Sequence, residues 1–327
     1  MPLLEVHKLS IRLQTRRGPA DAVRDVSFSL ECGETLGLIG ESGCGKSITA
    51  LALMGLLPER AALAGSIRFE QRELVGLDDA ALQHLRGNRI GMIFQEPMTA
   101  LNPVHTIGHQ VAEPLRLHRG ASRAAARRQA IALLDRVGIA DAGRRFDAYP
   151  HQFSGGQRQR ITIAMALACE PDLLIADEPT TALDVTIQGQ ILDLISDLVQ
   201  ERGMALLLIS HDLGVIAQNV ERMLVMYGGT VVESGPTPAV FAGMAHPYTR
   251  GLFGARPRLG AARGERLATI AGSVPELADL PAGCPFFERC PLALAACAST
   301  RPEPRLLGPA HHASCLRLDA GSAGEAA

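Results

Sequence analysis

Long apolar runs, a secretory leader and an excess of basic charge are all missing from this 327-residue sequence. No apolar run approaches the roughly 18 residues that a membrane-spanning helix needs, so we do not expect the chain to cross a membrane. Residues 1–6 lack a basic segment followed by an apolar one. No signal peptide is therefore predicted, and the chain is expected in the cytosol. A net charge of −2 gives no overall attraction to nucleic acid, and no nucleic-acid partner is expected.

Lysine is nearly absent as well. Only Lys8 and Lys46 are lysines, and the other 30 of the 32 basic residues are arginine. Lys46 lies in the stretch Gly40-Glu41-Ser42-Gly43-Cys44-Gly45-Lys46-Ser47, which fits the phosphate-loop pattern G-x-x-x-x-G-K-[ST]. A lysine at this position, in a chain that otherwise uses arginine, indicates a need for a compact ammonium group rather than a planar guanidinium. A glycine-rich turn that binds nothing would not have this need.

The residues around this loop have the strand-loop-helix order that the pattern requires. Residues 35–39 are a short apolar run typical of a buried strand, and residues 48–57 predict a helix that ends before Pro58. The glycines let backbone N–H groups surround phosphate oxygens, and the helix N-terminus adds positive potential. We therefore expect the stretch from Gly40 to Ile48 to bind ATP. In this arrangement Lys46 reaches the β- and γ-phosphates and the Ser47 hydroxyl binds Mg²⁺.

Strands and helices alternate along most of the chain. The predicted strands span residues 3–13, 22–30, 35–39, 65–69, 90–94, 173–176, 205–209, 223–227 and 230–233. The region 97–168 is mostly helical in pattern, with Ser122 as an N-cap, and a further helix is predicted at 186–201. This order predicts an α/β fold with a parallel sheet, flanked by an antiparallel sheet formed by the first strands. Ligand-binding residues are then expected at the carboxyl ends of the parallel strands.

Four polar side chains other than Lys46 follow predicted strands directly: Gln95, Asp177, Glu178 and His211. Asp177 fits a carboxylate that holds Mg²⁺. Glu178 beside it is expected to orient and deprotonate the attacking water, which makes it the candidate general base. His211 is a candidate contact to the γ-phosphate, and Gln95 a candidate ligand of the metal or the water. The alternative for the histidine is a simple capping role.

A second phosphate-cradling loop, Ser154-Gly155-Gly156-Gln157, precedes a predicted helix. The helical region between the two loops makes it hard for both to reach the same nucleotide. A dimer in which each loop faces the partner's nucleotide resolves this difficulty.

Taken together, these motifs resemble the nucleotide-binding subunit of an ATP-binding cassette (ABC) transporter over about residues 3–250. The resemblance includes the stretch Ala182-Leu183-Asp184, which matches the D-loop. It implies a P-loop NTPase fold with a RecA-like core, an antiparallel β-subdomain and an α-helical subdomain. It also implies a head-to-tail ATP sandwich, with Ser154, Gly155, Gly156, Gln157 and Asp184 at a nucleotide.

Three further stretches resemble the oligopeptide/dipeptide importer group: residues 95–103, His246-Pro247-Tyr248-Thr249-Arg250, and a tail that contains Cys284, Cys290, Cys297 and Cys315. The resemblance implies an ATPase domain over 1–253 and a C-terminal domain over 254–327, joined by linker-like residues 254–264. It implies pairing with a homologous ATP-binding subunit beneath two permeases at the cytoplasmic face of the membrane. An extracytoplasmic solute-binding protein would deliver di- or oligopeptides.

Two other functions remain open from the sequence. The first is a subunit of the same group that imports nickel, glutathione or a sugar oligomer, since the substrate touches the permeases rather than this chain. The second is a cassette ATPase that acts in DNA repair or on ribosomes. Such proteins usually carry a coiled-coil insertion or a second cassette, and the sequence shows neither. One departure concerns adenine. Leu13 stands where the group often has a stacking aromatic ring, so Arg12, Arg16 or Arg17 is a candidate substitute.

The four tail cysteines are separated by gaps of five, six and seventeen residues. In a cytosolic protein such a cluster indicates metal before disulfides. Structural zinc sites favour cysteine pairs two to four residues apart, and no such pair is present. The gaps and the resemblance favour a [4Fe–4S] cluster with a structural role. Zinc and free thiols remain the alternatives. The last residues, 321–327, are expected to be disordered.

Overall fold

Two β-sheets organise the fold in the computed structural model, which describes residues 1–181, 183–255 and 269–319. Over these residues an antiparallel sheet has the order β2-β1-β4-β5, and a larger mixed sheet has the order β11-β12-β10-β9-β3-β8-β7-β6. The strands are β1 (Leu4–Thr15), β2 (Gly18–Leu30), β3 (Thr35–Ile39), β4 (Ala62–Phe69), β5 (Arg72–Glu73), β6 (Ile90–Ile93), β7 (Leu173–Asp177), β8 (Ala205–Ser210), β9 (Arg222–Tyr227), β10 (Thr230–Pro236), β11 (Arg305–Gly308) and β12 (His311–Ala313).

The central strands of the mixed sheet are parallel, as predicted. β3 pairs with β8 and β9, and β7 pairs with β6 and β8, all in parallel register. Every residue of β7 and β8 is buried. The antiparallel sheet and α1 (Lys46–Leu53) cover one face of these strands and other helices cover the opposite face, so the strands read as continuous apolar runs rather than as alternating ones. The carboxyl ends of β3, β7 and β8 therefore meet at one edge.

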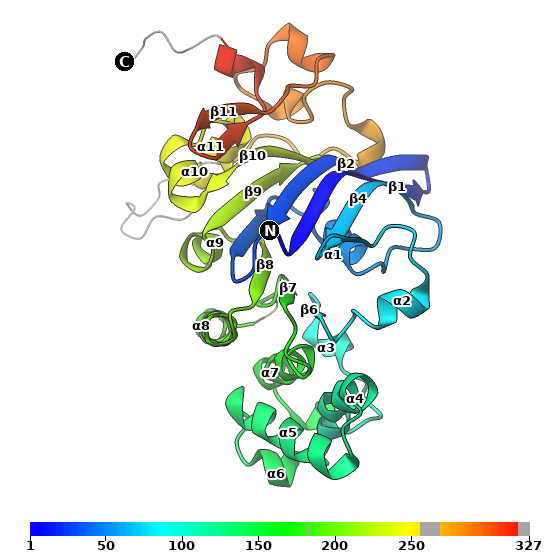
Figure 1. Ribbon diagram of the computed structural model, residues 1–327. Helices are drawn as coiled ribbons and strands as arrows, with labels where there is room; N and C mark the ends of the chain where they lie inside the picture. The colour runs from blue at the N-terminus through cyan, green and yellow to red at the C-terminus, as the bar shows by residue number, and fades with distance from the viewer. Residues whose placement is uncertain (182, 256–268, 320–327) are drawn as a thin grey trace.

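Some of the helices gather in a subdomain of their own (Figure 1). Those from α3 to α6 form a helical subdomain at the end of the molecule opposite the C-terminal strands, and α7 connects this subdomain to β6 of the mixed sheet. The α-helices are α1 (Lys46–Leu53), α2 (Asp79–Gln83), α3 (Pro97–Ala100), α4 (Ile107–Arg119), α5 (Arg123–Arg136), α6 (Ala142–Arg145), α7 (Gly155–Ala166), α8 (Val185–Arg202), α9 (Leu213–Asn219), α10 (Thr237–Gly243) and α11 (Pro247–Gly254).

Helix α5 shows how local sequence sets these elements. Ser122 caps it as predicted, because its hydroxyl accepts a hydrogen bond from the backbone N–H of Ala125 at 3.3 Å. Ala126, Ala130 and Leu134 fall on one face and are fully buried. The sequence thus places both the start of the helix and the face that it presents to the core.

The C-terminal region joins the mixed sheet, which the sequence did not predict. β12 pairs antiparallel with β10, with Glu233 opposite Ala313, and β11 pairs with β12. The tail therefore extends the sheet that carries the phosphate loop. The domain boundary at 253/254 remains a prediction. Most of the predicted linker 254–264 and all of 321–327 lie outside the described residues.

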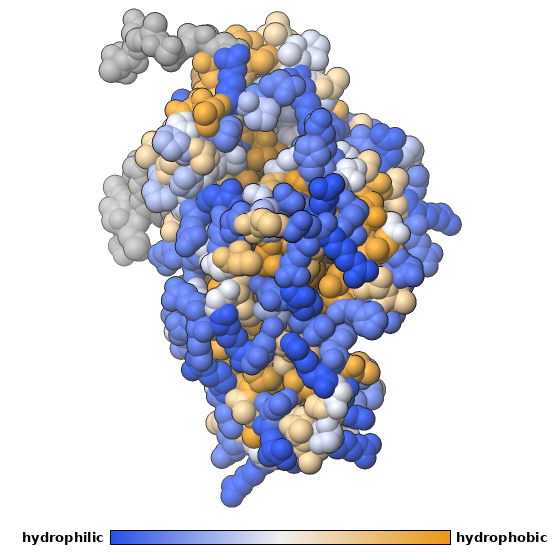
Figure 2. Space-filling view, viewed as in Figure 1, coloured by the Kyte–Doolittle hydropathy of each residue, from blue (hydrophilic) through white to orange (hydrophobic). Residues whose placement is uncertain are grey.

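In the part of the chain that the structure describes, no helix is long and apolar enough to span a membrane. Figure 2 shows the face seen in Figure 1, where hydrophilic side chains predominate and hydrophobic ones form smaller patches between them.

Candidate active site

The phosphate loop links the end of β3 to the start of α1. A Cβ atom on Gly40 would lie 2.2 Å from the carbonyl oxygen of Met226, and one on Gly45 would lie 2.7 Å from that of Ala22. Gly45 also has a φ of +104°. Neither position has room for a side chain, so these two glycines are needed for the loop to lie against β2 and β9.

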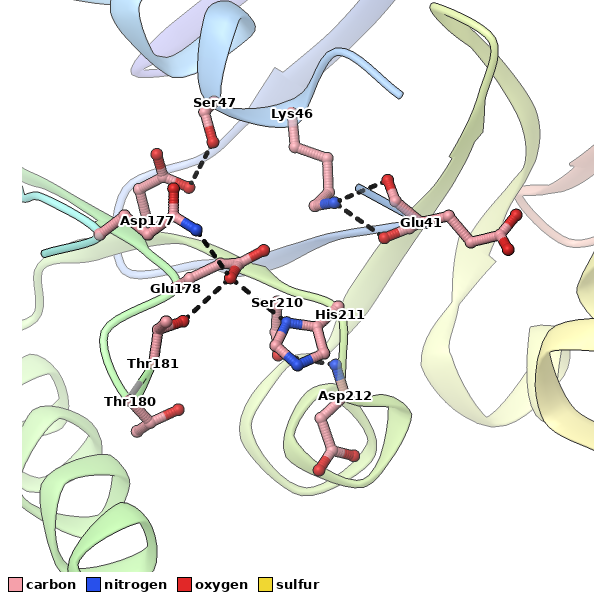
Figure 3. Close-up of polar contacts among 12 residues, drawn as sticks. Glu41, Lys46, Ser47, Asp177, Glu178, Thr180, Thr181, Ser210, His211 and Asp212 are labelled. Carbon is pink, nitrogen blue, oxygen red and sulfur yellow. Dashed lines mark hydrogen bonds and ion pairs between the residues drawn. The ribbon is translucent and has the colours of Figure 1, made fainter. Parts of the chain in front are cut away.

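The Lys46 side chain folds back across this loop and is only 5% exposed. Its Nζ donates hydrogen bonds to the carbonyl oxygens of Gly40 at 2.8 Å and Glu41 at 3.1 Å (Figure 3). The ammonium group is thus held inside the loop by neutral acceptors. This positive charge, beside backbone amides and the N-terminus of α1, makes the loop a site for an anion such as phosphate.

Ser47 and Asp177 form a pair of oxygen ligands beside the loop. The Ser47 hydroxyl donates to Asp177 Oδ1 at 3.0 Å, and Asp177 is 4% exposed at the end of β7. Burial raises the pKa of this carboxyl, an effect that the Ser47 hydrogen bond opposes. A carboxylate and a hydroxyl suit Mg²⁺, which usually takes its other ligands from water and substrate phosphates. The two residues therefore fit the predicted metal site.

Three polar groups converge on one oxygen of Glu178 (Figure 3). Glu178 Oε2 accepts hydrogen bonds from Gln95 Nε2 at 3.2 Å and Thr181 Oγ1 at 2.9 Å, and His211 Nδ1 lies 3.3 Å away. The carboxylate is 12% exposed, whereas His211 is 64% exposed. The structure thus brings together the predicted residues Gln95, Glu178 and His211. Thr181 was not predicted, because a threonine near an acidic residue is too common to stand out.

Glu178 also has an unusual backbone, with a φ of +46°. Its N–H donates to the carbonyl oxygen of Ile209 in β8 at 2.9 Å. Non-glycine residues rarely adopt this conformation, and it persists only where surrounding contacts hold it. The backbone bond to β8 and the three polar groups around the side chain supply those contacts here.

The second predicted loop lies at the start of α7, apart from α1. Ser154 and Gln157 form a reciprocal capping box, with the Ser154 hydroxyl accepting from the Gln157 N–H at 3.3 Å and Gln157 Oε1 accepting from the Ser154 N–H at 3.2 Å. Gly155 and Gly156 lie between these residues, in the first turn of α7. Asp184 is exposed at the N-cap position of α8. Ala182 lies outside the described residues.

Glu41 links the phosphate loop to two later parts of the chain. Its N–H donates to the hydroxyl of Tyr248 at 2.9 Å, and its carboxylate pairs with Arg289 at 2.7 and 3.2 Å. The Arg289 side chain is 5% exposed. Tyr248 and Arg289 lie in the two later stretches that resemble peptide importers, but nothing in the sequence indicated that either side chain contacts the phosphate loop.

The four tail cysteines lie within one small folded unit. Burial raises the pKa of Cys284 to about 11, with smaller increases from Cys297, Cys315 and Cys290. Within the described ranges, however, no three His, Cys, Asp or Glu side chains are grouped to hold a metal ion. Within these residues the structure thus gives no support to the predicted [4Fe–4S] cluster or to the alternative of zinc. The iron–sulfur assignment stays a prediction from spacing and resemblance.

Comparison with known proteins identifies two families along the chain. Residues 23–181 match the family described as ABC transporter, and residues 232–297 match the C-terminal region of oligopeptide/dipeptide transporters. A Brucella melitensis protein named for peptide import and ATP binding is 52% identical over 97% of both chains. The dipeptide transport ATP-binding protein DppD of Bacillus subtilis is 48% identical, over 97% of this chain and 95% of its own.

Among solved structures, the ATP-binding cassette MJ0796, in a dimeric post-hydrolysis state bound to ADP and Pi, superimposes with a TM-score of 0.64. It is 29% identical to this chain, and the match covers 72% of this chain and 98% of the other.

Proposed function

The chain belongs to the ATP-binding subunits of ABC transporters, and from this premise we propose that it hydrolyses ATP to power the uptake of di- or oligopeptides. The observation that carries the hydrolytic part is the convergence of Gln95, Thr181 and His211 on Glu178, next to the phosphate loop and the Ser47–Asp177 pair. Relatives about half identical to it over most of their length, named for peptide transport, support the substrate class.

Each residue has a role that follows from its place. Lys46 and the backbone amides of residues 40–48 would bind the phosphates, and Asp177 and Ser47 would hold Mg²⁺. The metal, when bound, supplies positive charge that stabilises the phosphoryl group in transfer. Glu178 would orient a water molecule and accept its proton. Gln95 and His211 would position that carboxylate and sense the γ-phosphate, since both reach the same oxygen of Glu178.

The change Glu178→Gln tests this assignment. It preserves shape but removes the base, so ATP should still bind while turnover falls roughly 10²–10⁴-fold, as is typical for loss of a general base. An ATP-bound dimer should accumulate. The matched control is Glu59→Gln, at an exposed carboxylate outside the site, which should leave turnover unchanged. Near-normal turnover of Glu178→Gln in the assembled transporter would place the base elsewhere.

We assign Ser154, Gly155, Gly156, Gln157 and Asp184 to the ATP bound by a partner subunit. The dimeric state of the similar cassette MJ0796 supports an assembly of two such subunits, and the homologous partner would make it a heterodimer. A Ser154→Cys variant should form a disulfide cross-link with a cysteine placed in the partner's phosphate loop when ATP is bound. A cross-link that forms only within one chain would refute this arrangement.

The remaining partners follow from the importer assignment. We propose that the dimer lies at the cytoplasmic face of the inner membrane, beneath two permeases that receive solute from an extracytoplasmic binding protein. Nickel, glutathione or a sugar oligomer is the alternative cargo. In reconstituted transporter, binding protein loaded with peptide should stimulate ATP hydrolysis more than the same protein offered any of the other three. Stimulation by one of those solutes alone would reassign the substrate.

For the tail we propose the [4Fe–4S] cluster that the cysteine gaps favour, with a structural role only. A cluster presents four iron corners, so its ligands lie farther apart than those of one ion, which suits gaps of five, six and seventeen residues. Anaerobically purified protein should then contain about four irons per chain. One zinc per chain, or no metal with the tail still folded, would refute the cluster.

A further inference from the structure

An open pocket of about 570 Å³ lies beside the phosphate loop, between three parts of the chain that are far apart in sequence. Its lining consists of Thr15, Arg16 and Arg17 at the β1–β2 turn, Ser42 and Gly43 of the loop, and residues 274–278 of the tail. This volume falls in the range of roughly 300–1,000 Å³ that small-molecule sites occupy. The phosphates of ATP lie in the loop itself, so its nucleoside part must extend to one side of it. The pocket is a space of suitable size that borders the loop directly.

Leu13 of the β1–β2 hairpin is not an aromatic residue that could stack on adenine. Two of the three arginines that could replace such a ring, Arg12 and Arg17, already form ion pairs. The Leu13 side chain is half-buried against the core beneath the antiparallel sheet. Arg12 pairs with Asp21 at 2.6 Å, and Arg17 pairs with the tail. The third arginine named from the sequence, Arg16, lines the pocket beside Arg17.

The tail supplies an apolar surface beside the phosphate loop, which the β1–β2 hairpin lacks. Val274, Pro275 and Leu277 are half-buried apolar side chains on the wall of the pocket. We propose that residues 274–278 form the surface against which the base of the bound nucleotide packs, with Arg16 on the hairpin side. The faces of a purine base are flat and apolar, so their burial against aliphatic side chains is favourable, and a guanidinium plane stacks on such a ring. This inference rests on the proposed ATP-binding function.

Two ion-pair anchors fix this surface relative to the phosphate loop. Arg17 donates to both carboxylate oxygens of Asp279, at 2.6 and 2.7 Å, and to Glu276 at 3.1 Å. Arg289 joins the tail to Glu41 inside the loop. One anchor is next to residues 274–278 and the other is in the loop, so the distance from the phosphate site to the wall is set before nucleotide binds.

Photolabelling of the full-length protein with 8-azido-ATP tests the proposal directly, because the reactive group is on the base. Label should appear in the tryptic peptide 267–289, within residues 274–278, and excess ATP should prevent it. Label confined to the β1–β2 hairpin or to the phosphate loop would overturn the assignment.

A substitution provides the second test. Leu277→Glu should weaken ATP binding about tenfold, or about 1.4 kcal/mol, and leave inorganic tripolyphosphate binding unchanged. Leu306→Glu, at an exposed leucine elsewhere in the tail, should change neither. Equal ATP affinity for Leu277→Glu and Leu306→Glu would overturn the proposal. Absence of binding of both ATP and tripolyphosphate to the unsubstituted protein would instead refute the proposed ATP-binding function, and not only the position of the base. If Leu277→Glu does not fold, the position of the azido label decides the question.

Discussion

Replacing Arg289 should loosen the tail more than replacing Arg17, even though Arg17 makes more ion pairs. Arg289 is 5% exposed and its partner Glu41 is 28% exposed. Arg17 is 54% exposed, and its partners Asp279 and Glu276 are 49% and 73% exposed. Water screens the ion pairs of Arg17 and competes for their hydrogen bonds, but it has little access to the Arg289–Glu41 pair.

The burial of each pair sets the size of the effect. Breaking a fully buried pair by removing one partner costs about 3–5 kcal/mol, because the remaining charge is left without compensation. Glu41 keeps some contact with water, so we expect about 2 kcal/mol for Arg289→Gln. Water screens the exposed pairs of Arg17, so we expect a smaller effect for Arg17→Gln.

Hydrogen exchange of the tail amides measures this difference. The Cys284 N–H donates to the carbonyl oxygen of Cys297 at 2.8 Å, so its exchange reports opening of the tail. A loss of about 2 kcal/mol corresponds to roughly 30-fold faster exchange in Arg289→Gln, and the acceleration in Arg17→Gln should be smaller. A double-mutant cycle with Glu41→Gln should show that most of the Arg289 effect is coupled to Glu41. Faster exchange in Arg17→Gln than in Arg289→Gln would refute the reasoning from burial.

Two further predictions concern buried titratable groups. Burial raises the pKa of Asp177 above its unfolded value, so its ionisation at neutral pH destabilises the fold. Asp177→Asn should therefore raise the Tm of nucleotide-free protein and abolish stabilisation by Mg–ATP in thermal denaturation. A lower Tm without nucleotide would contradict this. Burial also lowers the pKa of His246 to about 3. Neutral His246 contributes its full stabilisation above the pKa of an unfolded histidine, which is about 6.5. As the pH falls from there toward 3, the free energy of unfolding decreases by at most about 1.4 kcal/mol per pH unit. His246→Asn, which keeps an acceptor for the Tyr248 N–H, should flatten this slope in urea unfolding between pH 6 and 4, and an unchanged slope would exclude His246 as its source.

The sequence predicted which polar side chains gather beside the phosphate loop, because those residues directly follow strand ends. Apolar runs identified β3, β7 and β8, and the residue that follows a parallel strand must lie at the carboxyl edge of the sheet. Asp177 and Glu178 are placed by this rule alone. The contact of Ser47 with Asp177 follows because the phosphate loop after β3 and the end of β7 share that edge, with β8 between the two strands.

The contacts of the tail could not be predicted in the same way. Arg289 and Glu41 are 248 residues apart, and an arginine in a chain with 30 of them carries no signal of its own. β12 is a three-residue strand, too short for its alternation to be distinguished from a loop. It forms because β10 presents an open edge, which is a property of the folded sheet and not of the local sequence.

Glu41 connects these two parts of the molecule, because each of its polar groups has a different partner. Its carbonyl oxygen accepts from Lys46, its N–H donates to Tyr248 of α11, and its carboxylate pairs with Arg289 of the tail. A phosphate that draws Lys46 away removes only the first of these contacts, so the other two still fix the backbone of the loop. A loop held in this way loses less conformational freedom when nucleotide binds than a free one would. We therefore expect the docked tail to raise nucleotide affinity through the shape of the loop as well as through the wall at residues 274–278. Because the Arg289–Glu41 contact helps to hold the backbone of the loop, Arg289→Gln should weaken tripolyphosphate binding, which Leu277→Glu leaves unchanged.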